Sequence, residues 1–389
     1  MANTKITNPE LFNLGDSTSA TQLPVMTTTQ RIAMTGLSVG EMIFNSDTDK
    51  VEYWDGTKWY GITYEVSPYN NVLYTGTSLT NVITGVGFSP DLVWLKQRNS
   101  AQNHGLFDTV RGTNNFIMSN STSAENTRTT DTLSSFDDDG FTLTPYSSDA
   151  FINYTGRTMV AWCFKAGGAA VANTDGSIPS QVSANVAGGF SIVSYIGNGS
   201  SSEQTVGHGL DSAPELVIIK DLDNVRDWYV YTDIIDGSMD VLYLNLTDAK
   251  ANSSRTSPTS SVYKIAGTTT LNKSNQNFIS YCFHSVPGYS KVGSFVGNGL
   301  TTGGPVINFG FEPSWIMIKS TSFAERWVIY DNKRSTSNPR SKVLTANSNA
   351  AEIDTFYYDI NFTATGFTVN GTAAFTNRSG ESYIYLAFA

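Results

Sequence analysis

The sequence predicts an all-β protein, in which an N-terminal β-hairpin or meander module precedes three tandem antiparallel β-sandwich repeats of jelly-roll-like form. Three observations predict this fold class. Charged residues make up only 15% of the 389 residues while aromatic residues reach 12%, which suits aromatic-rich strands joined by tight turns. Short β-branched and aromatic runs alternate with Gly, Asn, Asp and Ser, as strands and turns do. Finally, the chain repeats itself at a spacing of about 100 residues.

Residues 1–30 form the first predicted segment. They are polar and interrupted by Pro9 and Pro24, a composition typical of a chain that becomes ordered only when it docks to a partner. We expect an extended segment.

Residues 31–66 form the second predicted segment, a small β-meander. An Asp-Gly pair at 55–56 separates two aromatic strand-like runs, and this pair is a strong signal for a tight turn. A unit of this size cannot bury enough apolar surface to be stable alone. We therefore expect it to need a neighbour, either the rest of this chain or other copies of it.

Three copies of one element order follow. In each copy a strand ends at a glycine (Gly76, Gly197 or Gly297) and a second, apolar strand ends at a lysine, with glycine-to-lysine distances of 20, 23 and 22 residues. A third apolar strand closes each copy, at 159–166, 278–285 and 383–389. Since the second and third strands are apolar on both faces, we expect them to be covered by the opposite sheet or by a neighbouring copy.

The repeat pattern sets the domain boundaries. The predicted sandwiches span residues 67–168, 188–286 and 287–389, and residues 169–187, rich in small residues and Gly pairs, are predicted to be a linker. The third copy follows the second directly, so in a linear stack it would lie farthest from the N-terminal segment.

The cysteines and histidines favour no metal or redox site. Cys163 and Cys282 occupy matching positions in the closing strands, and residues at matching sites of separate sandwiches lie too far apart for a disulfide. We expect free, buried thiols. His104, His208 and His284 share no ligand-like spacing, so surface or loop positions are expected for them.

Acidic residues offer two further candidates. The run Asp-Asp-Asp-Gly at residues 137–140, which begins with Asp137, resembles a calcium loop. Ligands of such loops alternate along the chain, so a solvated turn is the favoured interpretation and a calcium site remains the alternative. Asp108 and Arg111, and again Asp331 and Arg334, recur after a strand. Recurrence favours a contact that fixes a turn over a catalytic pair.

The stretch from Leu23 to Trp59 resembles a segment of bacteriophage fibre and tail proteins. The residues that carry the resemblance are Leu23, Pro24, Met26, Thr27, Gln30, Arg31, Gly40, Asn45, Trp54, Gly56 and Trp59. The three copies also look like sandwich repeats of marine phage structural proteins. The resemblance implies a virion component, a tail fibre or receptor-binding protein, and such fibres are commonly trimers. It also implies that residues 1–30 attach the protein to the rest of the particle and that the hairpin joins several chains, with Trp54, Trp59 and Tyr60 as the candidate oligomerisation residues.

From these observations we expect a structural virion protein, made in the host cytoplasm, that attaches to the tail by its N-terminus. Its sandwiches would bind a host-surface partner, a carbohydrate or a protein. The alternative is a capsid decoration or head-fibre protein without receptor binding. No catalytic, cofactor or metal site is expected, and an enzyme that degrades polysaccharide is a distant third hypothesis. The net charge of −10 argues against nucleic-acid binding, and the absence of a long apolar run argues against membrane insertion.

Overall fold

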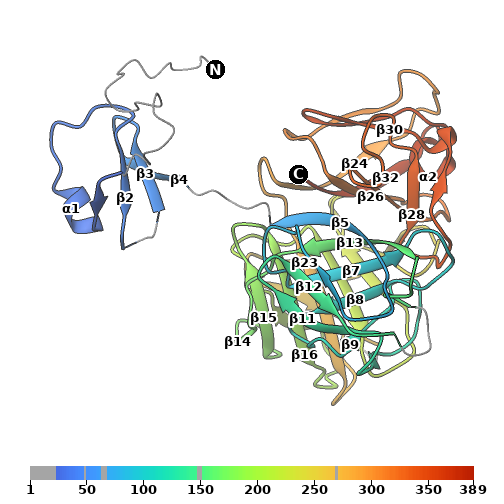
Figure 1. The fold of residues 1–389 in the computed structure, drawn as a ribbon. Helices are drawn as coiled ribbons and strands as arrows, with labels where there is room; N and C mark the ends of the chain where they lie inside the picture. The colour runs from blue at the N-terminus through green and yellow to red at the C-terminus, as the bar shows by residue number, and fades with distance from the viewer. Residues whose placement is uncertain (1–22, 48–49, 63–67, 147–150, 268–269) are drawn as a thin grey trace. The chain divides into compact units, whose positions relative to one another are not determined.

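A computed structural model describes residues 23–47, 50–62, 68–146, 151–267 and 270–389. The chain divides into two compact units, Met1–Val66 and Ser67–Ala389 (Figure 1). Nearly all regular structure is antiparallel β-sheet, which confirms the predicted all-β class. No helix in the described parts of the chain is long and apolar enough to span a membrane.

The first unit is a four-stranded sheet in the order β1-β2-β3-β4. Its elements are β1 (Val25–Met26), α1 (Thr28–Ile32), β2 (Met42–Asn45), β3 (Lys50–Trp54) and β4 (Trp59–Ile62). The predicted meander is β2 to β4. The sheet starts earlier than predicted, because β1 pairs parallel to β2 and Thr27 caps α1 through reciprocal hydrogen bonds with Gln30. Residues 1–22 of the predicted attachment segment lie outside the described residues.

The second unit contains three copies of one sandwich. The first consists of β5 (Tyr69–Thr75), β6 (Asn81–Ile83), β7 (Leu92–Gln97), β8 (Gly105–Asp108), β9 (Asn115–Phe116), β10 (Asn126–Thr127), β11 (Leu133–Asp137), β12 (Gly140–Leu143) and β13 (Thr158–Phe164). The second consists of β14 (Val171–Asn173), β15 (Ser180–Asn185), β16 (Phe190–Ile196), β17 (Gln204–Gly207), β18 (Leu216–Asp221), β19 (Tyr229–Thr232), β20 (Asp240–Tyr243), β21 (Ala251–Asn252), β22 (Val262–Ile265) and β23 (Asn277–Phe283). The third consists of β24 (Ser290–Val296), β25 (Val306–Asn308), β26 (Trp315–Ser320), β27 (Trp327–Asp331), β28 (Lys342–Thr345), β29 (Ile353–Asp354), η1 (Phe356–Tyr358), β30 (Ile360–Thr363), β31 (Gly366–Val369), α2 (Ala374–Asn377) and β32 (Ser382–Phe388).

The three copies have the same strand order in their larger sheet. That order is β5-β13-β7-β8 in the first copy, β16-β23-β18-β19 in the second and β24-β32-β26-β27 in the third. In each case the first strand of this order (β5, β16 or β24) pairs with the last strand of the copy. This agreement confirms the prediction of three sandwiches with similar topology.

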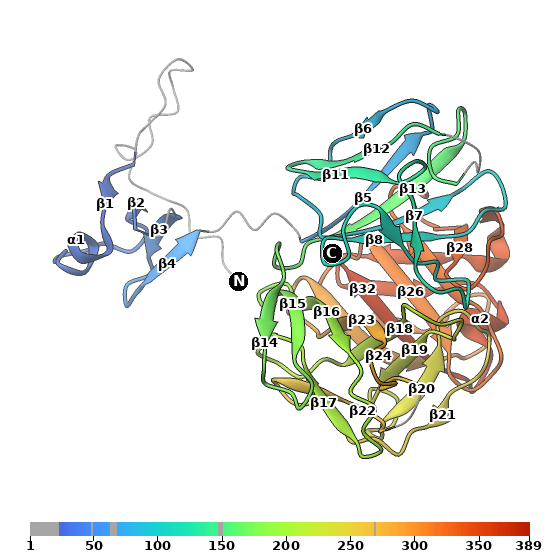
Figure 2. The ribbon, with the colours of Figure 1, turned by 90° about the horizontal axis from the view of Figure 1, so that it is seen from below.

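Each copy has its own apolar core, and a fourth core is shared by all three. The separate cores lie between the two sheets of each sandwich. The shared core collects the outward face of each larger sheet, including Trp162, Tyr281 and Leu386 from the three closing strands. Figure 2 shows these sheets meeting in the middle of the unit. The strands with two apolar faces are therefore covered both by the opposite sheet and by neighbouring copies.

Three buried lysines show that the copies form a closed ring. Lys96 of the first copy donates to the Asn349 carbonyl of the third. Lys220 of the second donates to Thr122 of the first, and Lys319 of the third donates to Thr247 of the second. Each copy thus contacts both others in the same sense. A linear stack, on which the distal position of the third copy depended, does not describe this arrangement.

The segment 169–187, predicted to be a linker, contains a β-hairpin. Strands β14 and β15 pair with each other, and β15 pairs with β16, so they extend the larger sheet of the second copy at its edge. The small residues that suggested a linker pack in this strand: Ser180 and Ser183 are buried, and the Ser183 hydroxyl donates to the Gly168 carbonyl.

Recurrence of the glycine after each first strand has a steric cause. A Cβ atom on Gly76, Gly197 or Gly297 would lie 2.2, 2.2 or 2.4 Å from a backbone carbonyl oxygen of the facing loop. No side chain fits at that distance. The glycine is therefore required wherever this sandwich is built.

Candidate functional site

The N-terminal unit brings two of the three predicted oligomerisation residues together. Trp54 and Trp59 are opposite each other in the β3-β4 hairpin, with ring centroids 5.7 Å apart and both side chains partly exposed. The Asp55 carboxylate closes the turn by accepting hydrogen bonds from the backbone N–H groups of Thr57 and Lys58. The side chain of Tyr60 lies outside the described part of the structure.

This unit has almost no core of its own. Among the side chains described in residues 23–47 and 51–59, Ile43 is the only fully buried hydrophobic one, while Ile32 and Val39 are 72% and 71% exposed. The interior contact is polar instead: Glu52 bonds to Arg31 at 2.5 Å and to Asn45 at 3.0 Å. Such a unit needs further apolar surface from outside itself to be stable.

The cysteine prediction is confirmed. Cys163 and Cys282 are free and fully buried, and burial raises the pKa of the Cys282 thiol to about 12. Ala387, at the matching position of the third copy, is also buried. The position is a small packing site.

The histidines lie in loops as predicted, but they are buried and not at the surface. His104 accepts from Trp94 Nε1 at 2.8 Å and its Nε2 lies 3.0 Å from the Thr345 carbonyl oxygen. Burial holds the pKa of His104 well below its usual value. His208 bonds to the backbone of Thr259 and Leu210. These rings satisfy backbone groups.

Asp137 is the last residue of β11, just before the turn to β12, and its carboxylate accepts a hydrogen bond from the Thr142 hydroxyl at 2.6 Å. No group of three or more His, Cys, Asp or Glu residues suited to a metal occurs in the described ranges.

The repeated Asp and Arg residues do fix turns, as predicted. The N–H of Arg111 donates to Asp108 at 2.9 Å, and that of Arg334 donates to Asp331 at 2.8 Å. Each arginine also forms an ion pair with its aspartate that is almost completely buried.

The same aspartates also bind the closing strand of the next copy. Asp108 accepts from the Tyr281 hydroxyl at 2.8 Å, and Asp331 accepts from Trp162 Nε1 at 3.0 Å. In the second copy, the strand register places Thr232 at the position of these aspartates. In the closing strand of the third copy, Leu386 occupies the position of Trp162 and Tyr281. At the junction between the second and third copies, both members of the polar pair are therefore replaced.

The three junctions share a backbone contact. The N–H groups of Glu125, Lys250 and Glu352, at one repeat position, donate at 2.8 Å to the carbonyls of Leu222, Thr321 and Arg98 in the next copy. Repeated backbone bonds thus set the distance between copies, and the side chains at these positions are free to differ.

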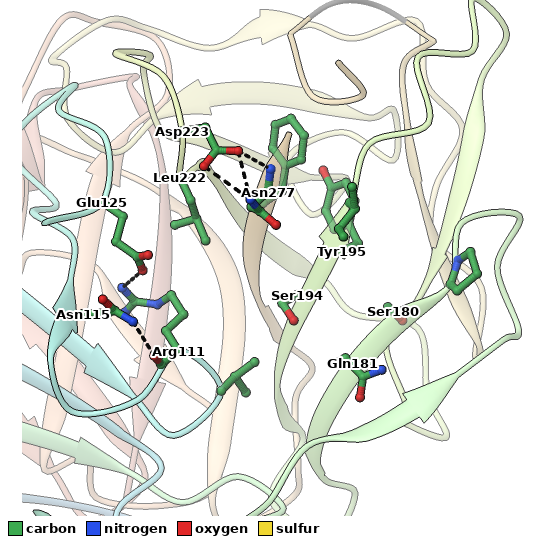
Figure 3. Close-up of a pocket in the computed structure, with 14 residues that line it drawn as sticks. Arg111, Asn115, Glu125, Ser180, Gln181, Ser194, Tyr195, Leu222, Asp223 and Asn277 are labelled. Atoms are coloured by element: carbon green, nitrogen blue, oxygen red, sulfur yellow. Dashed lines mark hydrogen bonds and ion pairs between the residues drawn. The ribbon is translucent and has the colours of Figure 1, made fainter. Parts of the chain in front are cut away.

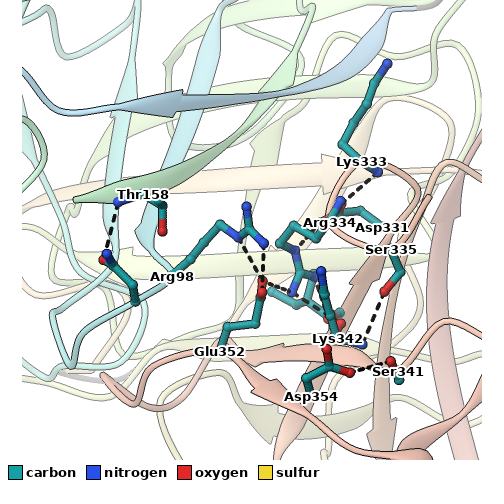
Figure 4. Close-up of polar contacts among 12 residues, drawn as sticks. Arg98, Thr158, Asp331, Lys333, Arg334, Ser335, Ser341, Lys342, Glu352 and Asp354 are labelled. Atoms are coloured by element: carbon teal, nitrogen blue, oxygen red, sulfur yellow. Dashed lines mark hydrogen bonds and ion pairs between the residues drawn. The ribbon is translucent and has the colours of Figure 1, made fainter. Parts of the chain in front are cut away.

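The junction between the third and first copies is bridged by charge (Figure 4). Arg98 binds both carboxylate oxygens of Glu352, at 2.8 and 3.0 Å. Arg334 adds a contact to Glu352 at 3.3 Å. At the junction between the second and third copies, the Lys250 side chain instead pairs within its own copy, with Asp236 at 2.6 Å and Asp240 at 2.8 Å.

The junction between the first and second copies is open. Leu222 occupies the position that corresponds to Arg98, so among the described residues Glu125 forms an ion pair only with Arg111, at 3.1 Å. Beside it is a pocket of about 590 Å³. Figure 3 shows Arg111, Asn115 and Glu125 on one side, Gln181 and Ser194 on the other, and Asp223 hydrogen-bonded to Asn277 at the end. Burial raises the pKa of Glu125.

Sequence reasoning did not find this pocket. Gln181 lies in β15, inside the segment predicted as a linker. Glu125 and Leu222 are recognised as pocket residues only when they are compared with Glu352 and Arg98, which occupy the corresponding positions of another junction. The available signal was the departure from the repeat at these positions.

Two family models match the chain. The one described as Domain of unknown function (DUF7483) covers residues 66–389, and the one described as Phage tail like trimerisation region covers residues 3–80. Neither curated proteins nor solved structures give a match. The N-terminal match indicates a structural protein of phage-tail type, a component of the virion that assembles as a homotrimer.

Proposed function

The chain belongs to the family described as Domain of unknown function (DUF7483), and we propose that it is a phage tail fibre protein that attaches by its N-terminus and presents its three-copy unit to the host surface. The partner we propose there is a carbohydrate. Assembly would take place in the host cytoplasm, and the protein would bind without catalysing a reaction.

The observation that carries this proposal is the contrast between the two units. The N-terminal unit, within the trimerisation match, leaves Ile32 and Val39 exposed and buries a single described hydrophobic side chain. The second unit has three cores of its own and a shared fourth. The first is suited to association and the second to standing free of the particle.

Trimerisation itself favours a surface-binding role. Three chains held together multiply weak contacts through effective concentration, and single sugar residues generally offer only weak contacts. An exposed aromatic pair, Phe356 and Tyr357, with ring centroids 4.1 Å apart, supplies apolar surface against which such a ligand can pack.

The alternative is a capsid decoration or head-fibre protein without receptor binding. No described contact favours it, and the match to a tail-like trimerisation region favours the tail. A receptor-binding fibre and a decoration protein differ in where they lie on the particle and in whether the isolated protein competes with it for cells.

Both differences can be measured. Gold-labelled antibody against the second unit should mark the tail in electron micrographs. The purified full-length trimer should reduce phage adsorption to cells on which the phage forms plaques, in a concentration-dependent way. Label on the capsid would refute the tail assignment, and unchanged adsorption at saturating protein would refute receptor binding.

A further inference from the structure

We propose that the pocket between the first and second copies is a binding site for a neutral sugar residue. This inference deepens the proposed function and rests on it for the biological source of the sugar. The pocket itself is defined by the described contacts of the second unit.

The place of the pocket in the fold is the first argument. Corresponding positions at the junction of the third and first copies are occupied by the Arg98–Glu352 bridge. With Leu222 in place of the arginine, the junction of the first and second copies lacks that bridge and contains a hollow of about 590 Å³. This size falls in the range of small-ligand pockets.

The second argument is that an inserted hairpin forms one wall. Pro179, Ser180 and Gln181 line the pocket and belong to the segment containing β14 and β15, which extends the larger sheet of the second copy beyond β16. In the described residues, neither of the other two copies has such strands. The hairpin thus adds polar side chains to a junction that lacks the charge bridge.

The third argument is the hydrogen-bonding chemistry of the lining. A carboxylate has about four acceptor sites, so Glu125 and Asp223 can accept further hydrogen bonds beside those from Arg111 and Asn277. The amides of Asn115, Gln181 and Asn277 can both donate and accept. Vicinal hydroxyl groups need this mixture, because each hydroxyl donates one hydrogen bond and accepts others.

Charge selects against anionic ligands. Arg111, the cationic residue that lines the pocket, is already engaged: it pairs with Asp108 and Glu125 and donates to the Leu106 carbonyl. The remaining charged lining residues are acidic. A sialic acid, phosphate or sulfate would therefore meet two carboxylates and a cation that is already neutralised, which disfavours binding.

An apolar strip completes the lining. Val110, Leu222 and Ile196 line the same pocket, and Ile196 is 57% exposed although it lies in a strand. A pyranose ring has an apolar C–H face as well as hydroxyl groups, so a lining with both characters suits it better than a purely polar cleft would.

The third copy provides a matched control position. Ile196 pairs with Asn277 at the end of β16, and Val296 pairs with Ser382 at the end of β24, in the same register. Their exposed fractions are 57% and 58%. Ile196→Trp should fill the pocket, whereas Val296→Trp places the same bulky side chain outside it.

The test is saturation-transfer NMR on the full-length trimer with a panel of neutral hexoses, deoxyhexoses, pentoses and N-acetylhexosamines, and with sialic acid as the anionic comparison. We expect at least one neutral sugar to bind, with an affinity reduced about 10-fold or more by Ile196→Trp and not by Val296→Trp. Gln181→Ala, a smaller change at an exposed residue, should reduce it about 3- to 10-fold. Thermal melting should show that all variants remain folded.

Two results would overturn the proposal: no neutral sugar binds, or Ile196→Trp and Val296→Trp bind equally. Preferred binding of sialic acid would overturn it as well. Failure of the pocket and failure of the proposed function are distinguishable by the adsorption assay. If the trimer competes for host cells and Ile196→Trp competes as well as wild type, the receptor role stands and the pocket assignment falls.

Discussion

Replacing Arg98 with leucine should weaken the junction between the third and first copies. The change reproduces the residue found at the corresponding position of the second copy, Leu222, and removes both hydrogen bonds from the guanidinium to Glu352, at 2.8 and 3.0 Å. The shared backbone bond from the Glu352 N–H to the carbonyl of residue 98 is kept.

The size of the effect follows from burial and from what Glu352 retains. Hydrogen bonds to charged groups contribute about 1.5–3 kcal/mol each when shielded from water. The side chains of Arg98 and Glu352 are 17% and 12% exposed, so solvent screens the pair in part. Glu352 also keeps its contact with Arg334 at 3.3 Å and is not left without a partner. We expect a loss of about 2–3 kcal/mol in the free energy of unfolding.

Urea unfolding of the full chain, at one fixed protein concentration, would measure this loss. Tryptophan fluorescence reports mainly on the second unit, which contains Trp94, Trp162, Trp228, Trp315 and Trp327. The control is Lys333→Leu, which removes an exposed positive charge from the same region and should change stability by less than about 0.5 kcal/mol. If Arg98→Leu unfolds at the same urea concentration as Lys333→Leu, the bridge does not stabilise the junction and the reasoning is wrong.

Three further predictions concern the glycine, the buried lysine and the tryptophan pair. Gly197→Ala places a Cβ 2.2 Å from a carbonyl oxygen and should lower the free energy of unfolding by about 3 kcal/mol or more. Gly237→Ala, where positive φ is the only conflict, should lower it by about 1–2 kcal/mol. Thermal melting compares the two variants, and equal losses of stability would contradict the steric account. Burial lowers the pKa of Lys96 to about 7, from an unfolded value near 10.4. Between these two pH values the unfolded state binds more protons than the folded state, so the free energy of unfolding should rise with pH by up to about 1.4 kcal/mol per pH unit. Urea titrations at pH 7 and 9 should show a smaller rise for Lys96→Met than for the wild type, and an unchanged rise would exclude this lysine as the source. Trp54→Ala combined with Trp59→Ala should shift the trimer toward monomer in analytical ultracentrifugation, and an unaffected trimer would remove these residues from the interface.

The all-β class and the three-copy organisation could be predicted because the repeated residues are locally required. Gly76, Gly197 and Gly297 recur since a Cβ would collide with backbone. Lys96, Lys220 and Lys319 recur since each satisfies carbonyls between copies. A residue imposed by the fold reappears in every copy, and such residues are the ones that self-comparison of a sequence detects.

The closed ring could not be predicted in the same way. A strand apolar on both faces indicates burial but does not name its cover, so the opposite sheet and a neighbouring copy stayed open as alternatives. Segment 169–187 shows a related limit. Its strand β15 packs small serines, Ser180 and Ser183, beside one β-branched residue, Val182, whereas strands are recognised by runs of β-branched and aromatic residues.

His104 illustrates why single positions were misjudged. By register it occupies the place of Trp228 and Trp327, and all three rings bond to equivalent carbonyls of a neighbouring copy: those of Thr345, Met118 and Tyr243. Seen alone in a loop, a histidine is expected at the surface. Its burial follows from a tertiary contact that no local pattern encodes.

The division between repeated and non-repeated contacts suggests how one fold can combine a fixed frame with a variable surface. Backbone bonds from residues 125, 250 and 352 and the three buried lysines hold each junction in the same way. Because those contacts fix the spacing between copies, side chains beside them can change without moving the sandwiches. One junction has acquired a charge bridge and another an open pocket. In a trimer this pocket occurs three times, so even a ligand held with a dissociation constant of about 1 mM per site could hold the particle at a surface that presents it densely.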